Sequence, residues 1–318
     1  MRLSLISKFR APRVHRHIAM LRDMESRFQN FPELLLTFQT FNKAHTTRHI
    51  LSPFLKAGCK NIVLFADGCA DNTLKVASRL LPGKGHFVVN DNNLHEILNY
   101  SLAEKIAEWS GAEFMLLAQD DDIYPQDLSW LQAAIAFMKA HPDVATVGFN
   151  GGYNFVGSIS DSDEGFATAK YVASREGGAD YAKLEPYYNL ISVPDAFRWN
   201  GTPFSYVDLI DRAPQLVRIS FLKEINGWPR QFAPYNYDDI YLCLAAWKSG
   251  WKVAHMPLPG IMRDVGIGGM RLFNKVTTTG RRPHLARNWH LLFEAFGDFV
   301  NNGALRAVVT QACETAVR

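Results

Sequence analysis

Short apolar runs alternate with amphipathic stretches between residues 33 and 150 of this sequence. Each run is too short for a helix and is bounded by polar residues, Gly or Pro, which is typical of a buried strand. Five strands are predicted in this way: Leu34–Phe38, Asn61–Phe65, His86–Val89, Phe114–Ala118 and Val144–Phe149.

Helices are predicted between these strands because apolar residues recur there at helical spacing. They cover Thr46–Ala57, a stretch capped by Asp71, His95–Trp109, and a stretch whose apolar face runs from Leu128 to Met138. Strict alternation of strand and helix predicts the α/β class, with a mostly parallel sheet flanked by helices. Ligands of such sheets bind outside the carboxyl ends of the strands.

The pattern changes after residue 150. Residues 151–203 are rich in Gly, Tyr, Ser and Asp and are expected to be irregular, whereas periodicity returns at Leu216–Glu224 and Ile240–Lys248. Leu285–Arg318 is expected to be mostly helical. We therefore divide the chain into a basic N-terminal segment (1–32), a main domain (33–260, with halves 33–150 and 151–260), and a Gly-rich loop with C-terminal helices (261–318).

Carboxylates follow two of the predicted strands. Asp67 ends the second strand, and Asp120, Asp121 and Asp122 follow the fourth. Three adjacent carboxylates repel one another and have raised pKa values unless a cation lies among them. Asp120 and Asp122 suit Mg²⁺ or Mn²⁺ bound together with a diphosphate. The alternative is a solvated acidic turn that caps the next helix.

A second acidic pair, Asp238 and Asp239, follows an aromatic loop and precedes a helix. One interpretation is a helix cap. The other is a general base at the mouth of a site.

Charge is distributed unevenly along the chain. The 318 residues carry a net charge of +3, but residues 1–28 hold seven basic and two acidic residues, a net of +5. This segment could form an amphipathic helix on an anionic membrane, or a solvated tail. The remainder is nearly neutral, and the aromatic residues are not interleaved with the basic patch, which argues against nucleic-acid binding.

Four cysteines without a CxxC pair favour a reducing compartment. The first apolar stretch has about five residues before Lys8, too short for a signal peptide. No run reaches the roughly 18 apolar residues of a membrane span. We expect a cytoplasmic protein, with peripheral membrane contact through the basic N-terminus as a further expectation.

Several segments together resemble family 2 glycosyltransferases of the GT-A fold. TFQTFNKA resembles the family's P-x-Y-N-R segment, FADGCADNT its DDGSxDxT, NNLHEILNYSL its N-x-G-x-A-x-N-x-G, and LLAQDDDIYPQDL its DXD strand. LKEINGWPRQFAPYNYDDIYLCLAAWKSGWKVAHMP resembles its GGF…EDxDLxxR block. The resemblance spans about residues 34–257. It departs from the family at Ala66, Cys69, Tyr241 and Ala245.

The resemblance implies a metal-dependent inverting glycosyltransferase. The donor would be a nucleoside-diphosphate sugar, with UDP as the expected nucleotide and Mn²⁺ or Mg²⁺ as cofactor. The acceptor would be a saccharide or lipid-linked glycan in polysaccharide or glycoconjugate biosynthesis.

The resemblance also implies roles for individual residues. Asp67 would hydrogen-bond the base, Asp121 would lie near the ribose or sugar, and Asp239 would be the catalytic base beside Asp238. The nucleoside pocket and the nucleotide-sugar site would include Thr40, Phe41, Asn42 and Asn93. Asp120 and Asp122 would hold the metal. A one-residue slip would put Gln119 and Asp121 in those roles, and we prefer Asp120 and Asp122 because both are acidic.

Weaker candidates remain. His255 or His284 could be a third metal ligand or an ordinary histidine, and the Gly-rich stretch 260–271 could close over a diphosphate or be a surface loop. Five aromatic residues could stack on sugars or belong to the core: Tyr153, Tyr187, Tyr188, Trp199 and Tyr206.

Three other classes compete with this interpretation. A degenerate GT-A domain would bind saccharide or a partner without turnover, and the departures from the family patterns keep this alternative open. A sugar-nucleotide nucleotidyltransferase would need a Gly-rich, Arg-containing loop after the first strand, which FQTFNKA lacks. A haloacid-dehalogenase-type phosphatase would carry its acidic pair after the first strand, not the fourth.

Overall fold

The computed structural model describes most of the chain between Phe31 and Ala316. The described ranges are 31–81, 85–161, 190–193, 197–211, 214–263 and 278–316. The basic segment therefore lies outside the described residues, except for Phe31 and Pro32, and so does most of the Gly-rich loop.

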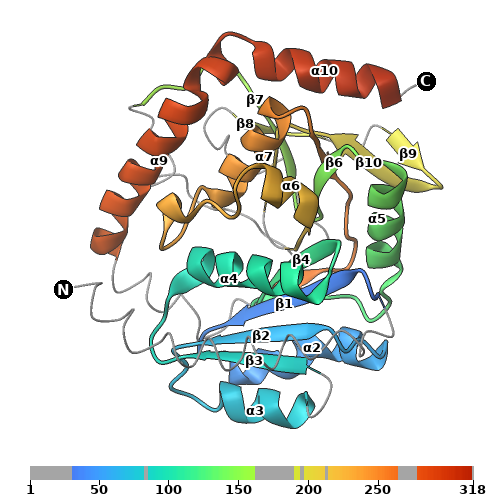
Figure 1. Cartoon of the computed structure of the whole chain (residues 1–318), viewed down its shortest axis with the longest axis vertical. Coiled ribbons are helices and arrows are strands. Elements are labelled where there is room, and N and C mark those ends of the chain that lie inside the picture. The colour runs from blue at the N-terminus through green and yellow to red at the C-terminus, as the bar shows by residue number, and fades with distance from the viewer. Residues whose placement is uncertain are drawn as a thin grey trace.

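The first half alternates strands and helices as the apolar pattern predicts (Figure 1). Its elements are β1 (Leu34–Thr40), α2 (Ala44–Lys56), β2 (Ile62–Asp67), α3 (Thr73–Leu80), β3 (Gly85–Asn90), α4 (His95–Ser110), β4 (Phe114–Gln119), β5 (Asp122–Ile123), α5 (Ser129–Ala140) and β6 (Val144–Gly148). The five strands and four helices predicted for this half are confirmed. Strands β1, β2 and β4 are almost wholly buried, which explains their continuous apolar runs.

The second half has shorter strands, and both parallel and antiparallel pairs occur in it. It contains β7 (Gly152–Phe155), β8 (Leu190–Ser192), β9 (Phe197–Trp199), β10 (Thr202–Tyr206), β11 (Leu209–Ile210), β12 (Gln215–Arg218), α6 (Ile219–Glu224), the 3-10 helix η4 (Arg230–Phe232), α7 (Asp238–Lys248), β13 (Lys252–His255), β14 (Met262–Arg263), α9 (Thr278–Asn301) and α10 (Ala304–Ala316). The C-terminal helices are confirmed, and Figure 1 shows α10 at the opposite end of the molecule from α3.

The main sheet has nine strands in the order β3-β2-β1-β4-β12-β6-β13-β10-β9. β1 pairs in parallel with β2 on one side and with β4 on the other. The chain thus adds β2 and β3 on one side of β1 and then adds β4 on the other side. The gap between the carboxyl ends of β1 and β4 is a topological switch point, where open α/β sheets bind ligands.

Two expectations for the second half were wrong in part. The periodic stretch Leu216–Glu224 begins as strand and continues as helix α6, because β12 is inserted antiparallel between β4 and β6 and all four of its residues are buried. A short strand that is covered on both faces shows no alternation from which to predict it. The stretch 151–203, expected to be irregular, contains β7, β8, β9 and the start of β10, whose short runs carry little pattern.

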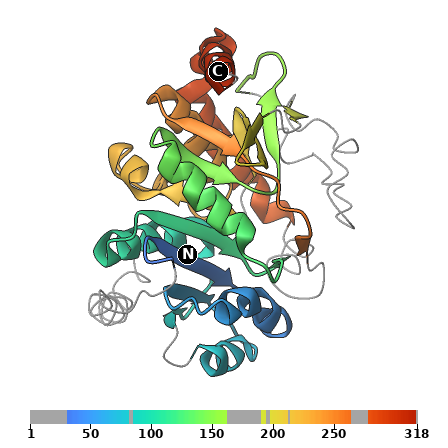
Figure 2. The same cartoon turned by 90° about the vertical axis from the view of Figure 1, so that its right-hand side faces the viewer.

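No helix within the described ranges is both long and apolar enough to cross a membrane. The four cysteines are all free thiols. Figure 2 shows α5 in the middle of the view, where it packs beside β6 of the sheet.

Asp208 is a buried carboxylate in the turn between β10 and β11, and it gives a test of this part of the fold. It is 2% exposed, and its Oδ2 accepts a hydrogen bond from the Phe155 backbone N–H at 2.8 Å. Burial raises the pKa of Asp208 to about 6, although the charge of Arg306 opposes the shift.

We expect Asp208→Asn to stabilise the protein above pH 6 and to have little effect near pH 4. The folded state holds the Asp208 proton more tightly than the unfolded chain, so the free energy of unfolding falls as pH rises from about 4 to about 6. Removing the charge should recover up to about 3 kcal/mol at pH 8, since each pKa unit is worth about 1.4 kcal/mol. Urea unfolding at pH 4, 6 and 8 measures this. Asp298→Asn, at an exposed position, is the control, and equal gains at pH 4 and pH 8 would contradict the prediction.

Candidate active site

The carboxyl ends of β1, β2 and β4 bring together three of the segments singled out in the sequence. These segments are Thr40–Lys43, Asp67–Thr73 and Gln119–Asp122. They meet because β1 lies between β2 and β4 in the sheet.

Asp120 joins the end of β4 to the end of β1. Its Oδ2 accepts a hydrogen bond from the Phe41 backbone N–H at 2.7 Å, and its backbone carbonyl accepts one from the Thr46 hydroxyl at 3.1 Å. Burial and the neighbouring charge of Asp121 raise the pKa of Asp120 to about 7, while the ammonium of Lys43 acts in the opposite direction. A nearby positive charge would stabilise the ionised form of this carboxyl group.

Lys43 is a basic residue at this point that the sequence did not single out. Its side chain is among the largest that are fully buried, with the residue 1% exposed, and it lies close enough to Asp120 to lower that residue's pKa. Its backbone N–H donates to Thr73 Oγ1 at 2.9 Å. Its position in the sequence could have indicated it. Lys43 directly follows Asn42, where the family pattern P-x-Y-N-R has arginine.

Asn42 ties the β1 end to the β2 end. Its Oδ1 accepts hydrogen bonds from the backbone N–H groups of Ala70 (2.7 Å) and Asp71 (3.3 Å), and its φ is +54°. The N-cap of α3 is Asn72 and not Asp71, so the predicted cap is wrong by one residue. Asp71 precedes the N-cap, and its Oδ1 accepts a hydrogen bond from the Thr73 N–H at 2.9 Å. Thr40 is buried and Phe41 is half-buried.

Asp67 is completely buried, and each of its two carboxylate oxygens accepts two hydrogen bonds from the protein. Oδ1 accepts from Asn90 Nδ2 (2.9 Å) and the Leu94 N–H (2.8 Å), and Oδ2 accepts from the His95 N–H (2.8 Å) and Gln39 Nε2 (3.3 Å). Burial raises the pKa of Asp67, against the effect of these hydrogen bonds. The expected hydrogen bond to a base would have to replace one of these four.

Asp67 thereby holds the start of α4, whose first N–H groups have no partner within the helix. Gly68 permits the close approach, since a Cβ at that position would lie 2.4 Å from the Asn93 backbone nitrogen. Asn93 takes part through its Oδ1, which also accepts from the His95 N–H at 2.9 Å. The next residue, Glu96, accepts a hydrogen bond from Gln119 Nε2 at 3.2 Å. The start of α4 is therefore bonded to the end of β4, one residue before Asp120.

The acidic triplet supplies oxygen donors of the kind that Mg²⁺ and Mn²⁺ prefer, so the donor set fits these cations in type. Asp120 and Asp121 are half-buried, whereas Asp122 is 0% exposed in β5, in register with Arg263 of β14. No three His, Cys, Asp or Glu side chains of the described ranges form a metal-coordinating group. Such ions are commonly held by one or two carboxylates together with substrate phosphates and water.

The second acidic pair opens α7. Asp238 is completely buried, and its Oδ2 accepts a hydrogen bond from the Trp228 indole N–H at 3.2 Å. Asp239 is half-buried, and its Oδ1 accepts from the Ile240 N–H at 2.9 Å. The two neighbours therefore differ: Asp238 is part of the packing, and Asp239 is the more accessible carboxylate.

Two groups hold the loop that leads to this pair. Glu104 of α4 is buried, and its Oε2 accepts from the Trp228 backbone N–H at 2.7 Å. Asn288 of α9 is also buried and donates through Nδ2 to the carbonyls of Phe232 (2.7 Å) and Tyr235 (3.0 Å). The sequence did not single out Glu104 or Asn288, because neither belongs to a motif.

The weaker candidates are dispersed. His255 is buried in β13 and His284 is half-buried in α9, and neither belongs to a metal-type cluster in the part of the chain that the structure describes. Trp199 packs edge-on against Phe137, and Tyr206 packs against Phe204, which is core packing. Tyr153 donates a hydrogen bond to Asp211 Oδ2 at 3.1 Å. Tyr187, Tyr188 and residues 264–271 lie outside the described residues.

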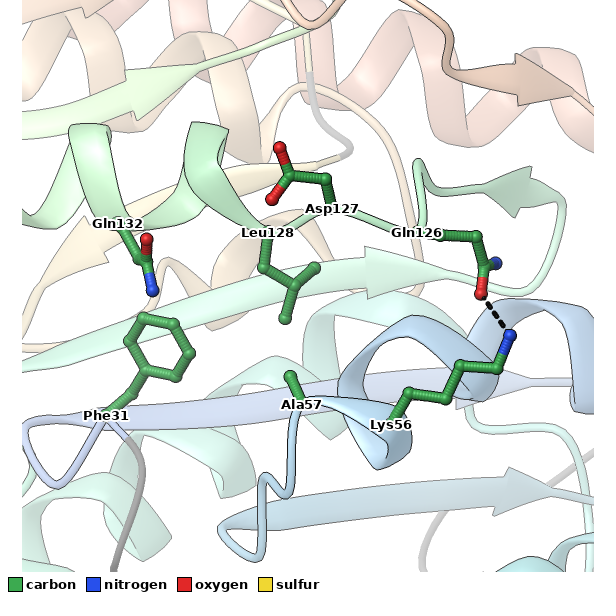
Figure 3. Close-up of a pocket in the computed structure, with 7 residues that line it drawn as sticks. All are labelled: Phe31, Lys56, Ala57, Gln126, Asp127, Leu128 and Gln132. Carbon is green, nitrogen blue, oxygen red and sulfur yellow. Dashed lines mark hydrogen bonds between the residues drawn. The ribbon is translucent and has the colours of Figure 1, made fainter.

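A separate pocket of about 520 Å³ lies beside the end of α2 and the segment before α5 (Figure 3). Lys56 Nζ donates to Gln126 Oε1 at 2.8 Å across its wall. None of the predicted site residues lines this pocket. Its lining consists of Phe31, Lys56, Ala57, Gln126, Asp127, Leu128 and Gln132.

No protein-family model and no curated protein matches this sequence. Solved structures match the fold. The structure of GalNAc-T7 with UDP, GalNAc and Mn²⁺ matches with a TM-score of 0.54 at 11% identity, covering 78% of this chain and 47% of that chain. The structure of S. aureus TarS matches with a TM-score of 0.44 at 13% identity, covering 72% of this chain and 36% of that chain. This chain spans less than half the length of either structure.

The match to GalNAc-T7 concerns the fold, and it identifies the sheet described above as the GT-A fold of glycosyltransferases. The predicted fold class is therefore confirmed. The S. aureus TarS match lies below a TM-score of 0.5 and adds nothing to this conclusion.

Proposed function

We propose that this protein is a metal-dependent inverting glycosyltransferase, similar to family 2, that uses a nucleoside-diphosphate sugar as donor. The observation that carries the proposal is the junction of β1 and β4, where Asp120 accepts the Phe41 N–H beside the buried ammonium of Lys43. This junction is the switch point of a GT-A sheet, where ligands of open α/β sheets bind.

On the donor side, the proposal assigns the nucleoside to the segment Thr40–Asn42 and the diphosphate to the acidic triplet. Asp120 would hold Mn²⁺ or Mg²⁺ together with Asp122, which is buried in β5, and Asp121 would face the ribose or sugar. The cation, when bound, offsets the charge that the leaving diphosphate develops. The buried Lys43 side chain lies at the same point. UDP is the expected nucleotide, and the UDP and Mn²⁺ in the GalNAc-T7 structure support both choices.

On the acceptor side, the proposal assigns proton removal to Asp239. A sugar hydroxyl is a poor nucleophile at neutral pH, and a carboxylate within hydrogen-bond reach can accept its proton as the new glycosidic bond forms. The half-buried Asp239 is open to an acceptor, while the bond from Trp228 to the neighbouring Asp238 fixes the start of α7. The acceptor is proposed to be a saccharide or lipid-linked glycan. Peripheral membrane contact through residues 1–32 at the cytoplasmic face is a separate part of the proposal.

Donor binding can be measured by thermal unfolding with UDP-glucose, UDP-galactose, UDP-GlcNAc and UDP-GalNAc in the presence of Mn²⁺. We expect at least one of these to raise the unfolding midpoint by roughly 3–6 °C at a concentration about 100 times its Kd. The shift should be lost in excess EDTA and in Asp120→Asn. Asp127→Asn, which removes a carboxylate from the separate pocket lining, is the matched control.

The outcomes separate the competing classes. Release of UDP on addition of a saccharide acceptor supports transfer, whereas binding without release under all acceptors favours a degenerate domain. Formation of pyrophosphate from UTP and a sugar phosphate favours a nucleotidyltransferase. A midpoint that no nucleotide sugar changes contradicts the proposal, and a full shift in excess EDTA contradicts its metal part.

A further inference from the structure

His95 begins α4 in a backbone conformation that residues with a side chain seldom adopt. Its φ is +61°, in the left-handed region. The pattern N-x-G that this segment resembles has glycine at that position, and glycine adopts this conformation freely. The turn is fixed through the backbone, since the His95 N–H donates to Asp67 Oδ2 (2.8 Å) and Asn93 Oδ1 (2.9 Å). The imidazole is not required for these bonds, so a histidine here points to a role for its ring.

The His95 ring is one of three aromatic rings that come from separate parts of the chain. Its centroid lies 4.9 Å from that of Tyr235, in the loop before α7, and the Tyr235 centroid lies 6.1 Å from that of His284 in α9. All three residues are half-buried, so each retains accessible surface. We call His95, Tyr235 and His284 the ring cluster.

Residues next to the ring cluster in the sequence connect it to both halves of the candidate active site. Glu96, next to His95, accepts from Gln119 at 3.2 Å, and Gln119 precedes the acidic triplet. Tyr235 lies four residues before Asp239, in the loop whose carbonyls Asn288 holds at 2.7 and 3.0 Å. The Ile97 N–H donates to the Pro234 carbonyl at 3.4 Å, which closes the contact between α4 and this loop.

We propose that the ring cluster binds a pyranose ring of the saccharide acceptor. Aromatic faces carry partial negative charge and attract the partly positive C–H groups of a sugar face. The polar atoms at the ends of histidine and tyrosine can hydrogen-bond the hydroxyls at its edge. The identity of the ligand as an acceptor rests on the proposed function, because the cluster adjoins the loop of the proposed base.

The test uses the full chain and saturation-transfer NMR with methyl glycosides of glucose, galactose, mannose, GlcNAc and GalNAc. Wild type should transfer saturation to ring protons of at least one glycoside. His95→Gly should reduce this signal at least fivefold without lowering the unfolding midpoint, since glycine suits φ +61°. Tyr235→Ala should reduce it similarly. His290→Ala, which removes an exposed histidine of the same helix α9, is the matched control and should leave the signal unchanged.

Equal signals in wild type and His95→Gly would overturn the inference, and so would a wild type that gives no signal with any glycoside. A lower unfolding midpoint for His95→Gly would also overturn it, because the imidazole would then be a structural group. The UDP-sugar shift of the same proteins tests the proposed function separately. A wild type with a donor shift and no glycoside signal contradicts this inference alone.

Discussion

Asp239→Asn is expected to lower the rate of sugar transfer by about 10²- to 10⁴-fold while leaving donor binding intact. The amide cannot accept the proton of an acceptor hydroxyl, and general-base catalysis is worth about that factor. Folding should be nearly unaffected, because Asp239 is half-buried and its side chain accepts the N–H of the following residue, a bond that an amide oxygen can also accept. The loss of charge at the start of α7 costs about 0.3–1 kcal/mol.

The measurement is UDP release under saturating donor and acceptor, together with the thermal shift given by the donor. Asp143→Asn is the matched control, since Asp143 is an exposed aspartate whose ion pair with Lys252 contributes little to stability. Turnover by Asp239→Asn above one tenth of wild type would show that another group removes the proton. A loss of the donor shift in this variant would instead place Asp239 on the donor side.

The first half of the fold could be predicted because its central strands are covered on both faces. β1, β2 and β4 are six or seven residues long and mostly apolar, and helices with one apolar face separate them along the chain. β12 could not be predicted, since it has four residues, all buried, and therefore shows no alternation of apolar and polar positions. Its antiparallel insertion between β4 and β6 depends on pairing across the sheet, which a local pattern does not contain.

The acidic residues of the candidate site could be predicted because they follow strands directly. Their different environments could not, since burial depends on segments distant in the sequence. Asp238 and Asp239 are adjacent, yet one is buried under the Trp228 indole and the other is half-buried. Lys43 was missed for the same reason: a single lysine in a polar loop gives no sign that it will be fully buried beside Asp120.

The environment of Asp67 also could not be predicted from the sequence, and this environment is the basis of the second prediction with a large expected effect. The sequence offers Asp67 as a residue after a strand, but the four donors that surround it include two backbone N–H groups at the start of α4. Backbone donors have no sequence signature. The structure therefore adds an anchoring role to a residue for which the resemblance implied only a contact with the base.

Asp67→Asn is expected to destabilise the protein by about 2–4 kcal/mol. An amide offers one acceptor atom where the carboxylate offers two, so two of the four donors lose their partner or face an N–H group, at about 1–3 kcal/mol each. The burial that raises the pKa of Asp67 makes the charged form costly, and removing the charge offsets part of this loss. Urea unfolding at pH 7 measures the change in the free energy of unfolding.

Asp71→Asn is the control for this prediction, because it changes the same residue type in the neighbouring loop at an exposed position. Its amide oxygen can still accept the Thr73 N–H, and the Ala44 N–H that Oδ2 accepts at 3.1 Å lies at an exposed position where water can replace the lost oxygen. The loss of stability should therefore stay within about 1 kcal/mol. If Asp67→Asn is as stable as wild type but loses the UDP-sugar shift, Asp67 serves the base and not the helix. If stability and the shift fall together, while the shift returns at a saturating donor concentration, Asp67 acts by holding the start of α4 in place.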